Sequence, residues 1–265
     1  MNDPYKKLKD AAKLGWATFA MMQNVTGTGA PKLVRFAGVT SGADVLDVGC
    51  GTGVVALAAA RVGANVTGLD LTPELLAHAK ENAAMAEIAA TWVEGDAEAL
   101  PFPDERFDFV VSQFGHMFAP RPEVAVREML RVLKPGGTIA FSTWPPELFV
   151  ARMFAITAKY APPLPEGVPP VTAWGDPATI RVRLGNGVHA LEHERDRIWF
   201  PTLSPQHARA AFEVFGPGKR LVAMLAEDAP DKMDAWRREV DALAAEYFVD
   251  NRLRQEFLMT RARKS

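Results

Sequence analysis

Residues 47–53 of the sequence, DVGCGTG, combine an aspartate with three glycines directly after a short apolar run. A glycine-rich turn that follows a strand lets a ligand approach the backbone, and its most common ligand is a nucleotide pyrophosphate. A dinucleotide turn has the spacing Gly-x-Gly-x-x-Gly, but Val54 stands here where the last glycine should be. The carboxylate of Asp47 would repel a pyrophosphate and attract an ammonium group, directly or through a water molecule. The turn therefore favours a ligand without phosphates.

Two further carboxylates follow the next two apolar runs. Asp70 ends the run NVTGLD, and Asp96 lies in EGDAEALPF. In open α/β sheets ligands bind beyond the carboxyl ends of the strands, where Asp70 can accept hydrogen bonds from both ribose hydroxyls. Asp96 can accept from an exocyclic amino group, while the backbone N–H of Ala97 donates to a ring nitrogen. Asp70 alone would also suit a nicotinamide dehydrogenase, but Asp96 with Ala97 predicts recognition of adenine.

His116 is the histidine with the most informative position, because it follows the fourth strand of the pattern. An imidazole there can act as a general base, since its ordinary pKa lies near 6.5. It can equally line a pocket or bond to a backbone carbonyl, and the sequence leaves both interpretations open. No metal site is predicted, because His189 and His193 lie in a segment with a strand pattern and have no third ligand nearby. Cys50, between two glycines, is interpreted as a small buried residue.

The elements that must position these residues alternate along the chain. Five short apolar strands between about residues 44 and 144 are separated by alanine-rich or amphipathic helices. Such alternation implies right-handed βαβ crossovers and a mostly parallel sheet with helices on both faces, so the fold class is α/β. Thr72 and Pro73 are expected to begin the helix after Asp70, although Asp70 itself could also serve as a helix cap.

The segments before and after this core are predicted separately. Apolar residues spaced by three and four indicate one helical face near the start of the chain, either a lid over the ligand or simple packing: Tyr5, Leu8, Ala12, Trp16, Phe19 and Met22. The lysines of this helix are expected mostly off that face. After residue 144 we expect a helix over 147–160, a proline loop over 161–170, a strand over 190–200, a helix capped by Ser204, a core helix around Trp236 and a last strand near 255–263.

Composition restricts the class of protein. The chain has 265 residues, 30 basic against 32 acidic side chains and one cysteine. A net charge of -2 gives no electrostatic footprint for nucleic acid or for an anionic membrane. A single cysteine cannot form an internal disulfide and favours a reducing compartment. The first residues have no secretory pattern and no apolar run could span a bilayer, so we expect a cytoplasmic protein without stable membrane insertion.

Taken together, the motifs DVGCGTG, LD at the second strand end, GDAEALPF, FDFVVS and EMLRVLKPGG resemble those of class I S-adenosylmethionine-dependent methyltransferases in order and spacing. They look most like the branch that includes ubiquinone and menaquinone biosynthesis enzymes, and the match covers about residues 40–145. The resemblance implies a Rossmann-like, seven-stranded, mostly parallel sheet with an added helical cap. It implies three regions: a helical lid over 1–39, a cofactor-binding core over 40–145 and a cap with the last strands over 146–265.

The resemblance also implies roles for individual residues. Residues near the bound S-adenosylmethionine would be Asp47, Gly49, Gly51, Thr52, Gly53, Asp70, Leu71, Asp96, Ala97, Ser112, Gln113 and Phe114. Asp47 would lie near the ammonium group, Asp70 at the ribose, and Ser112, Gln113 and Phe114 around the methyl group. His116 would be the candidate base.

The expected reaction is in-line methyl transfer to an oxygen, nitrogen or carbon of a small molecule. Aromatic residues such as Phe149, Phe154 and Trp174 suggest an apolar or aromatic acceptor. Two alternatives are a binding protein that has lost catalysis and, disfavoured by Val54, an NAD-dependent oxidoreductase.

Overall fold

A computed structural model of the chain describes residues 5–214 and 216–265. Within them the strands form one eight-stranded sheet, with the order β3-β2-β1-β4-β5-β8-β6 and the short β7 paired beside β8. The strands are β1 (Asp44–Val48), β2 (Asn65–Asp70), β3 (Thr91–Glu94), β4 (Phe107–Gln113), β5 (Leu133–Thr143), β6 (Val188–Pro201), β7 (Phe248–Val249) and β8 (Arg252–Lys264). The expected α/β fold and mostly parallel sheet are confirmed.

The first five strands are parallel, and the last ones are not. β8 pairs antiparallel with both β5 and β6, whereas β1, β2, β3, β4 and β5 pair parallel. The parallel strands have few exposed side chains because helices cover both faces. The turns at their carboxyl ends therefore meet at one edge, which is where open α/β sheets bind their ligands.

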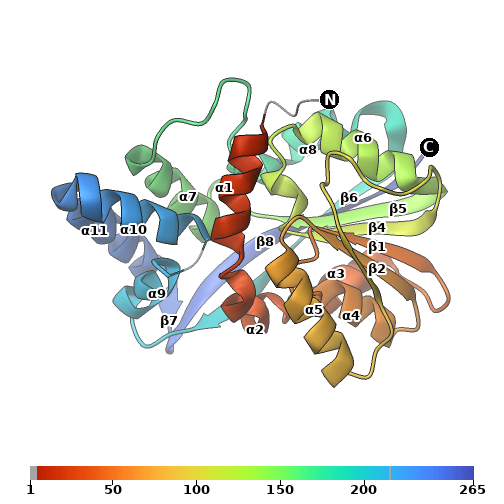
Figure 1. Cartoon of the computed structure of the whole chain (residues 1–265), viewed down its shortest axis with the longest axis horizontal. Coiled ribbons are helices and arrows are strands. Elements are labelled where there is room, and N and C mark those ends of the chain that lie inside the picture. Colours follow the sequence, from red (N-terminus) through yellow and green to blue (C-terminus); the bar gives the residue numbers. More distant parts are fainter. Residues whose placement is uncertain (1–4, 215) are drawn as a thin grey trace.

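Helices cover the two faces of the sheet (Figure 1). On one face lie α3 (Ala30–Ala37), α4 (Val54–Arg61) and α5 (Pro73–Met85); on the other lie α6 (Pro122–Val132) and α8 (Pro177–Leu184). The N-cap position of α5 is Thr72, with Pro73 at its first turn as expected, although the Thr72 side chain makes no capping bond. One large hydrophobic core connects the sheet with both layers.

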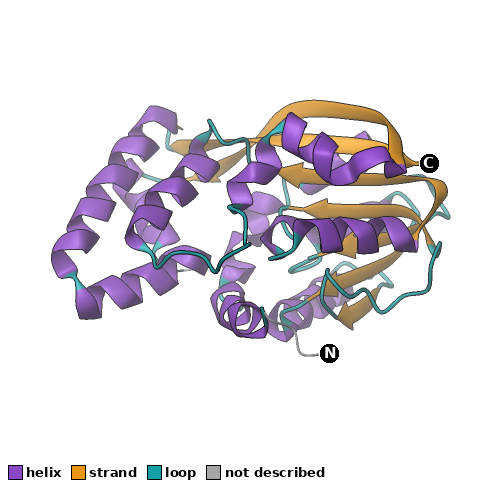
Figure 2. Cartoon of the chain, turned by 90° about the horizontal axis from the view of Figure 1, so that it is seen from above, coloured by secondary structure: helices purple, strands orange, loops and turns teal. Residues whose placement is uncertain are grey.

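A second group of helices lies beyond the carboxyl ends of the parallel strands (Figures 1 and 2). It consists of α7 (Phe149–Tyr160), α9 (Pro205–Phe212), α10 (Gly216–Asp228) and α11 (Pro230–Tyr247). Ser204 caps α9 by accepting the His207 N–H at 3.1 Å, as expected. Trp236 of α11 is 1% exposed and packs with Leu221 and Leu225 of α10, so it is a core residue. The proline segment 161–170 contains neither helix nor strand, as its composition predicts.

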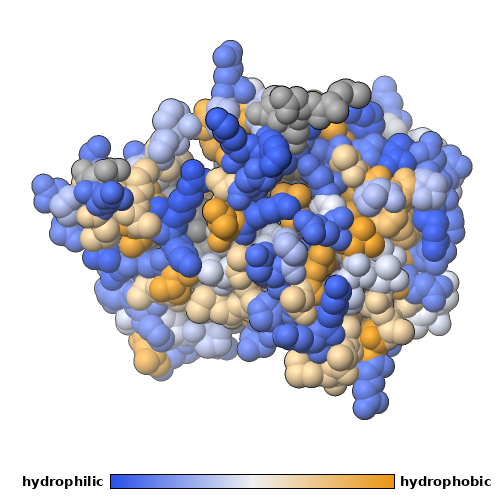
Figure 3. Space-filling model, in the orientation of Figure 1, coloured by the Kyte–Doolittle hydropathy of each residue, from blue (hydrophilic) through white to orange (hydrophobic). Residues whose placement is uncertain are grey.

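The segment from α1 to α2 runs between the sheet and this helical cap (Figure 1). The expected single helix is divided into α1 (Lys6–Trp16), the 3-10 turn η1 (Phe19–Met22) and α2 (Gln23–Thr26). No helix formed by residues 5–214 and 216–265 combines the length and apolar character needed to cross a bilayer. On the face shown in Figure 3, hydrophobic side chains reach the surface in separate spots between hydrophilic ones.

Candidate functional site

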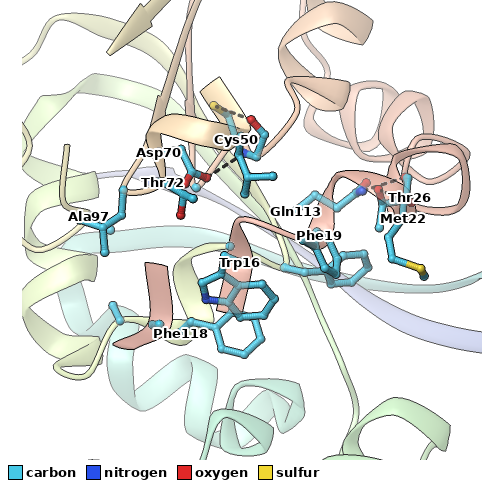
Figure 4. Close-up of a pocket in the computed structure, with 18 of the residues that line it drawn as sticks. Trp16, Phe19, Met22, Thr26, Cys50, Asp70, Thr72, Ala97, Gln113 and Phe118 are labelled. Atoms are coloured by element: carbon cyan, nitrogen blue, oxygen red, sulfur yellow. Dashed lines mark hydrogen bonds between the residues drawn. The ribbon is translucent and has the colours of Figure 1, made fainter. Parts of the chain in front are cut away.

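A cavity of about 230 Å³ lies at the carboxyl edge of β1, β2 and β4, between the sheet, the N-terminal helices and the cap. Its wall is mostly apolar. Of the cofactor residues expected from the sequence, those that line it are Gly49, Gly51, Thr52, Asp70, Leu71, Asp96, Ala97, Gln113 and Phe114. Figure 4 shows the carboxylate of Asp70 on one side of this space and the amide of Gln113 on another.

The three glycines of the turn after β1 differ in the space that surrounds them. All three have positive φ: 66° at Gly49, 54° at Gly51 and 81° at Gly53. A Cβ on Gly49 would lie 2.8 Å from the Cα of Gly115, and one on Gly53 would lie 2.5 Å from the ring of Trp92. A Cβ on Gly51 would meet no heavy atom within 4 Å. Protein packing therefore requires two of the glycines, whereas Gly51 leaves open space beside the cavity.

Asp70, at the end of β2, organises the mouth of the cavity. One of its carboxylate oxygens accepts the Gly51 N–H at 2.8 Å, and the other accepts the Thr72 N–H at 2.8 Å. Burial raises the pKa of this carboxyl, and the N–H groups of Thr72 and Gly51 oppose that shift. The Asp70 carboxylate also lines the cavity, where an oxygen can accept from a ligand hydroxyl. Asp70 therefore fixes the glycine turn and faces the cavity, whereas the N-cap position of the next helix is Thr72. The contact of Asp70 with a ribose stays a prediction.

Asp47 does not lie at the mouth of the turn. It is 1% exposed, is not part of the cavity wall, and accepts the Ala56 N–H of α4 at 3.0 Å. Its other oxygen has no hydrogen-bond partner. Burial raises its pKa to about 7, with a smaller contribution from the negative charge of Asp70. The expected contact with an ammonium group thus has no direct route in this geometry and would require a bridging water.

Asp96 and Ala97 line the cavity beside Asp70, but sequence reasoning missed the partner of Asp96. Lys9 of α1 donates to Asp96 at 2.6 Å and to Glu98 at 2.5 Å. Glu98 also accepts three N–H groups of Arg121. Lys9 is 7% exposed, so it lies on the buried face of α1, contrary to the expectation for this lysine. A largely buried ion pair at the Asp96 end of the cavity thus joins the N-terminal helix to the sheet.

The apolar stripe of the N-terminal segment forms part of the cavity wall. Its lining members are Leu8, Ala12, Trp16, Phe19 and Met22. The Trp16 ring lies 4.5 Å from that of Phe118 and 5.4 Å from that of Phe19, measured between centroids (Figure 4). Of the two possibilities left open by the sequence, this geometry favours a lid over simple packing.

The three residues expected around the methyl group, at the end of β4, are arranged differently from one another. Ser112 is fully buried and donates to the Val48 carbonyl at 2.6 Å. It does not line the cavity, contrary to the expectation that it lies around the methyl group. The side chain of Gln113 donates to the Thr26 carbonyl at 2.8 Å. Phe114, at a φ of 61°, stacks on Trp144 with the ring centroids 3.9 Å apart. Gln113 and Phe114 both face the cavity.

His116 does not have the position expected of a general base. It is 1% exposed, lies outside the cavity wall and packs against the rings of Phe141 and Trp174, both at 4.6 Å between centroids. Neither ring nitrogen has a hydrogen-bond partner. Burial, with a contribution from the charge of Arg183, lowers its pKa to about 3. A neutral, enclosed imidazole of this kind is a core residue, and the structure opposes the expected catalytic role.

Two other sequence interpretations concern cysteine and histidine. Cys50 is 5% exposed, and burial raises its pKa well above the ordinary thiol value, which agrees with a buried residue and opposes a nucleophile. His189 and His193 both lie in β6, and His193 is bonded to Thr260 at 3.0 Å. Over the described part of the chain, no three His, Cys, Asp or Glu side chains gather to hold a metal ion.

Comparisons with a protein family, with relatives and with solved structures indicate a methyltransferase. Residues 46–141 match the family model described as a methyltransferase domain. The Mycobacterium tuberculosis protein Rv1405c is 37% identical over 248 residues, which are 92% of this chain and 89% of that protein. Demethylmenaquinone methyltransferase of Staphylococcus aureus is 41% identical over 138 residues, 50% of this chain and 57% of that one. A putative methyltransferase structure from Bacillus halodurans superposes with a TM-score of 0.61 at 23% identity, covering 89% of this chain and 99% of that one.

Proposed function

Because this chain belongs to the class I S-adenosylmethionine-dependent methyltransferases, we propose that it methylates a small, apolar or aromatic molecule by in-line displacement. The observation that supports this acceptor is the wall of the cavity on the side away from Asp70. That wall consists of Gln113, Phe114, Trp144, Val150, Met153, Phe154, Phe212 and Gln255. Apolar side chains with few polar groups are typical of sites for small molecules.

The residues of the other side fit S-adenosylmethionine. Gly51 leaves open space against the backbone, Asp70 has acceptor capacity for ribose hydroxyls, and Asp96 with Ala97 lies beside it. When bound, the cofactor supplies an electrophilic methyl group on a sulfonium that is already a good leaving group. The chain then has to align the acceptor and exclude water, which is worth roughly 7–11 kcal/mol for well-oriented reactants. Trp16, Phe19 and Phe118 cover the cavity and serve this purpose.

No side chain of the chain is assigned as a base. His116 is enclosed and neutral, and a base is needed only when the nucleophile must lose a proton. The S. aureus relative is named for demethylmenaquinone, but it matches only half of this chain. Its acceptor is therefore not transferred to this protein. We place the enzyme in the cytoplasm because its one cysteine is free.

Thermal unfolding with S-adenosylhomocysteine, S-adenosylmethionine and NAD tests the cofactor. A ligand at a hundred times its dissociation constant adds about 2.7 kcal/mol, which raises the melting temperature by roughly 5–10 °C at this size. We expect this shift with the first two compounds and none with NAD. A shift with NAD alone would support an oxidoreductase and overturn the proposal.

Methyl transfer itself separates an enzyme from a binding protein. The protein is incubated with methyl-labelled cofactor and a panel of phenols, amines and enolisable carbonyl compounds, and we expect label in at least one of them. Binding of the cofactor with no transfer to any compound would favour the non-catalytic alternative.

A further inference from the structure

Two glutamines, Gln113 and Gln255, supply amide groups at the acceptor side of the cavity, where Trp144 adds an indole N–H. Among the described residues that line the cavity, the ionisable ones are Lys9, Cys50, Asp70 and Asp96. They all lie at the glycine turn, at the ends of β2 and β3, or on the lid helix that contacts them. The acceptor wall therefore contains no charged residue, and its two amides are the side-chain groups that can both donate and accept a hydrogen bond.

The orientation of the Gln113 amide is fixed by its surroundings. Its nitrogen donates to the Thr26 carbonyl, so the group left over must be the oxygen Oε1. This oxygen is buried and has no hydrogen-bond partner. A Cβ on Gly29 would lie 3.1 Å from Gln113 Oε1 and 3.2 Å from Cγ2 of Ile198, so these two atoms belong to one neighbourhood.

Gln255 reaches the same neighbourhood from β8, which is two strands away from β4 in the sheet. It pairs in register with Ile198 across β6 and β8, and cross-strand partners point to the same face. Phe257, two residues along on that face of β8, contacts both Phe114 and Trp144, at 5.6 and 6.3 Å between ring centroids. Gln255 is 3% exposed, and its amide nitrogen has no hydrogen-bond partner.

An unpaired buried amide is costly. Leaving a buried donor or acceptor without a partner costs about 1–3 kcal/mol, and an apolar side chain of the same shape avoids that cost. The cross-strand partner of Gln255 is the aliphatic Ile198, and the next residue on the same face of β8 is Phe257, so a leucine would match these two neighbours. A residue that destabilises the free protein in a ligand cavity is typical of a binding function.

We propose that Gln255 determines acceptor specificity: its amide hydrogen-bonds a hydroxyl or carbonyl oxygen on a flat, uncharged acceptor that lies beside the Phe114–Trp144 stack, with Gln113 Oε1 as the neighbouring acceptor group. The proposal rests on the proposed function, since it concerns the acceptor side of the same cavity. The nucleophilic atom of the acceptor must also react without a protein base, because the described residues of that wall include none.

The test uses the full-length protein saturated with S-adenosylhomocysteine and two probes, 2-naphthol and naphthalene. Dissociation constants are measured from the fluorescence of the cavity tryptophans for the wild type and for Gln255→Leu. We expect the ratio of the naphthalene constant to the naphthol constant to fall roughly 3- to 10-fold in the variant, the value of one neutral hydrogen bond. Comparing ratios cancels the difference in hydration between the probes.

Three controls make the result decisive. Met153→Leu, an apolar exchange on the same wall, should leave the ratio unchanged. Gln255→Leu should bind S-adenosylhomocysteine as the wild type does, and its melting temperature should be equal or higher because an unpaired amide has been removed. A lower melting temperature with an unchanged ratio would mean that Gln255 has a structural partner and would overturn the proposal. If the wild type did not bind S-adenosylhomocysteine, the proposed function itself would be contradicted.

Discussion

The two sides of the cavity are built from different parts of the chain and by different means. On the donor side, where we propose that the cofactor binds, contiguous motifs supply a glycine turn, Asp70 and Asp96. Backbone N–H groups and Lys9 hold these two carboxylates. On the acceptor side, residues from β4, α7, α9 and β8 meet, and they are apolar except for two amides. The donor side therefore has a pattern that is visible in the sequence, and the acceptor side exists only after folding.

The largest effect should come from the glycine turn, and it tests whether the donor passes along Gly51. In Gly49→Ala the new Cβ meets the backbone at Gly115, so positive-φ strain of about 1–2 kcal/mol adds to overpacking of about 1–3 kcal/mol. In Gly51→Ala only the strain applies, because the space around its Cβ is open. Urea unfolding should show a clearly larger loss of stability for Gly49→Ala.

Calorimetry with S-adenosylhomocysteine completes this comparison. Gly51→Ala should remain folded but bind at least tenfold more weakly, because its methyl group occupies space left for the ligand. If Gly51→Ala bound as tightly as the wild type, the donor would not run along this turn.

The same contrast explains what the sequence could predict. The order of strands and helices, the α9 cap and the lining carboxylates follow from local periodicity and from motifs that are contiguous in the chain. Ser112 and His116 were placed wrongly because a strand end fixes where a residue lies, but not whether its side chain faces the cavity or the core. Ser112 turns to the Val48 carbonyl, and His116 packs against the rings of Phe141 and Trp174.

The roles of Lys9 and Gln255 could not be predicted, because their contacts join segments that lie far apart in the sequence. The partner of Lys9, Asp96, lies 87 residues away, and the place of Gln255 in the cavity depends on the pairing of β8 with β5 and β6. The sequence shows neither of these contacts without the fold.

An effect of intermediate size is expected at Asp47, where ionisation should change the free energy of unfolding with pH. Its pKa is raised from 3.8 to about 7 in the folded protein, so the native state binds the proton more tightly than the unfolded state. Stability from this group is therefore present at low pH and is lost as the pH rises from about 4 to about 7. Asp47→Asn keeps an acceptor for the Ala56 N–H but cannot ionise.

Urea unfolding at pH 5 and pH 8 measures this effect. Relative to the wild type, Asp47→Asn should gain stability between the two pH values, on the order of 2 kcal/mol. The change with pH is the measured quantity, since the unpaired amide of asparagine adds a constant offset. Parallel curves for both proteins would show that Asp47 is already ionised in the folded state.

His116 should give the smallest effect on activity, and it tests whether the acceptor side lacks a base. The ring is enclosed by Phe141 and Trp174, and its pKa is lowered from 6.5 to about 3. His116→Leu should therefore change kcat/KM by less than about threefold, because a base normally contributes about 10²–10⁴-fold. The assay uses whichever compound of the acceptor panel takes up label, with cofactor saturating.

Stability supplies a second measurement on the same variant. A histidine with a lowered folded pKa stabilises the protein above its unfolded pKa, and this contribution is lost as the pH falls below about 6.5. Wild-type protein should therefore lose more stability than His116→Leu between pH 7 and pH 5. A loss of activity of a hundredfold or more, with stability intact, would place His116 in proton transfer after all. The acceptor side would then have to open toward this ring during turnover, because no ionisable side chain on its described wall offers another route for the proton.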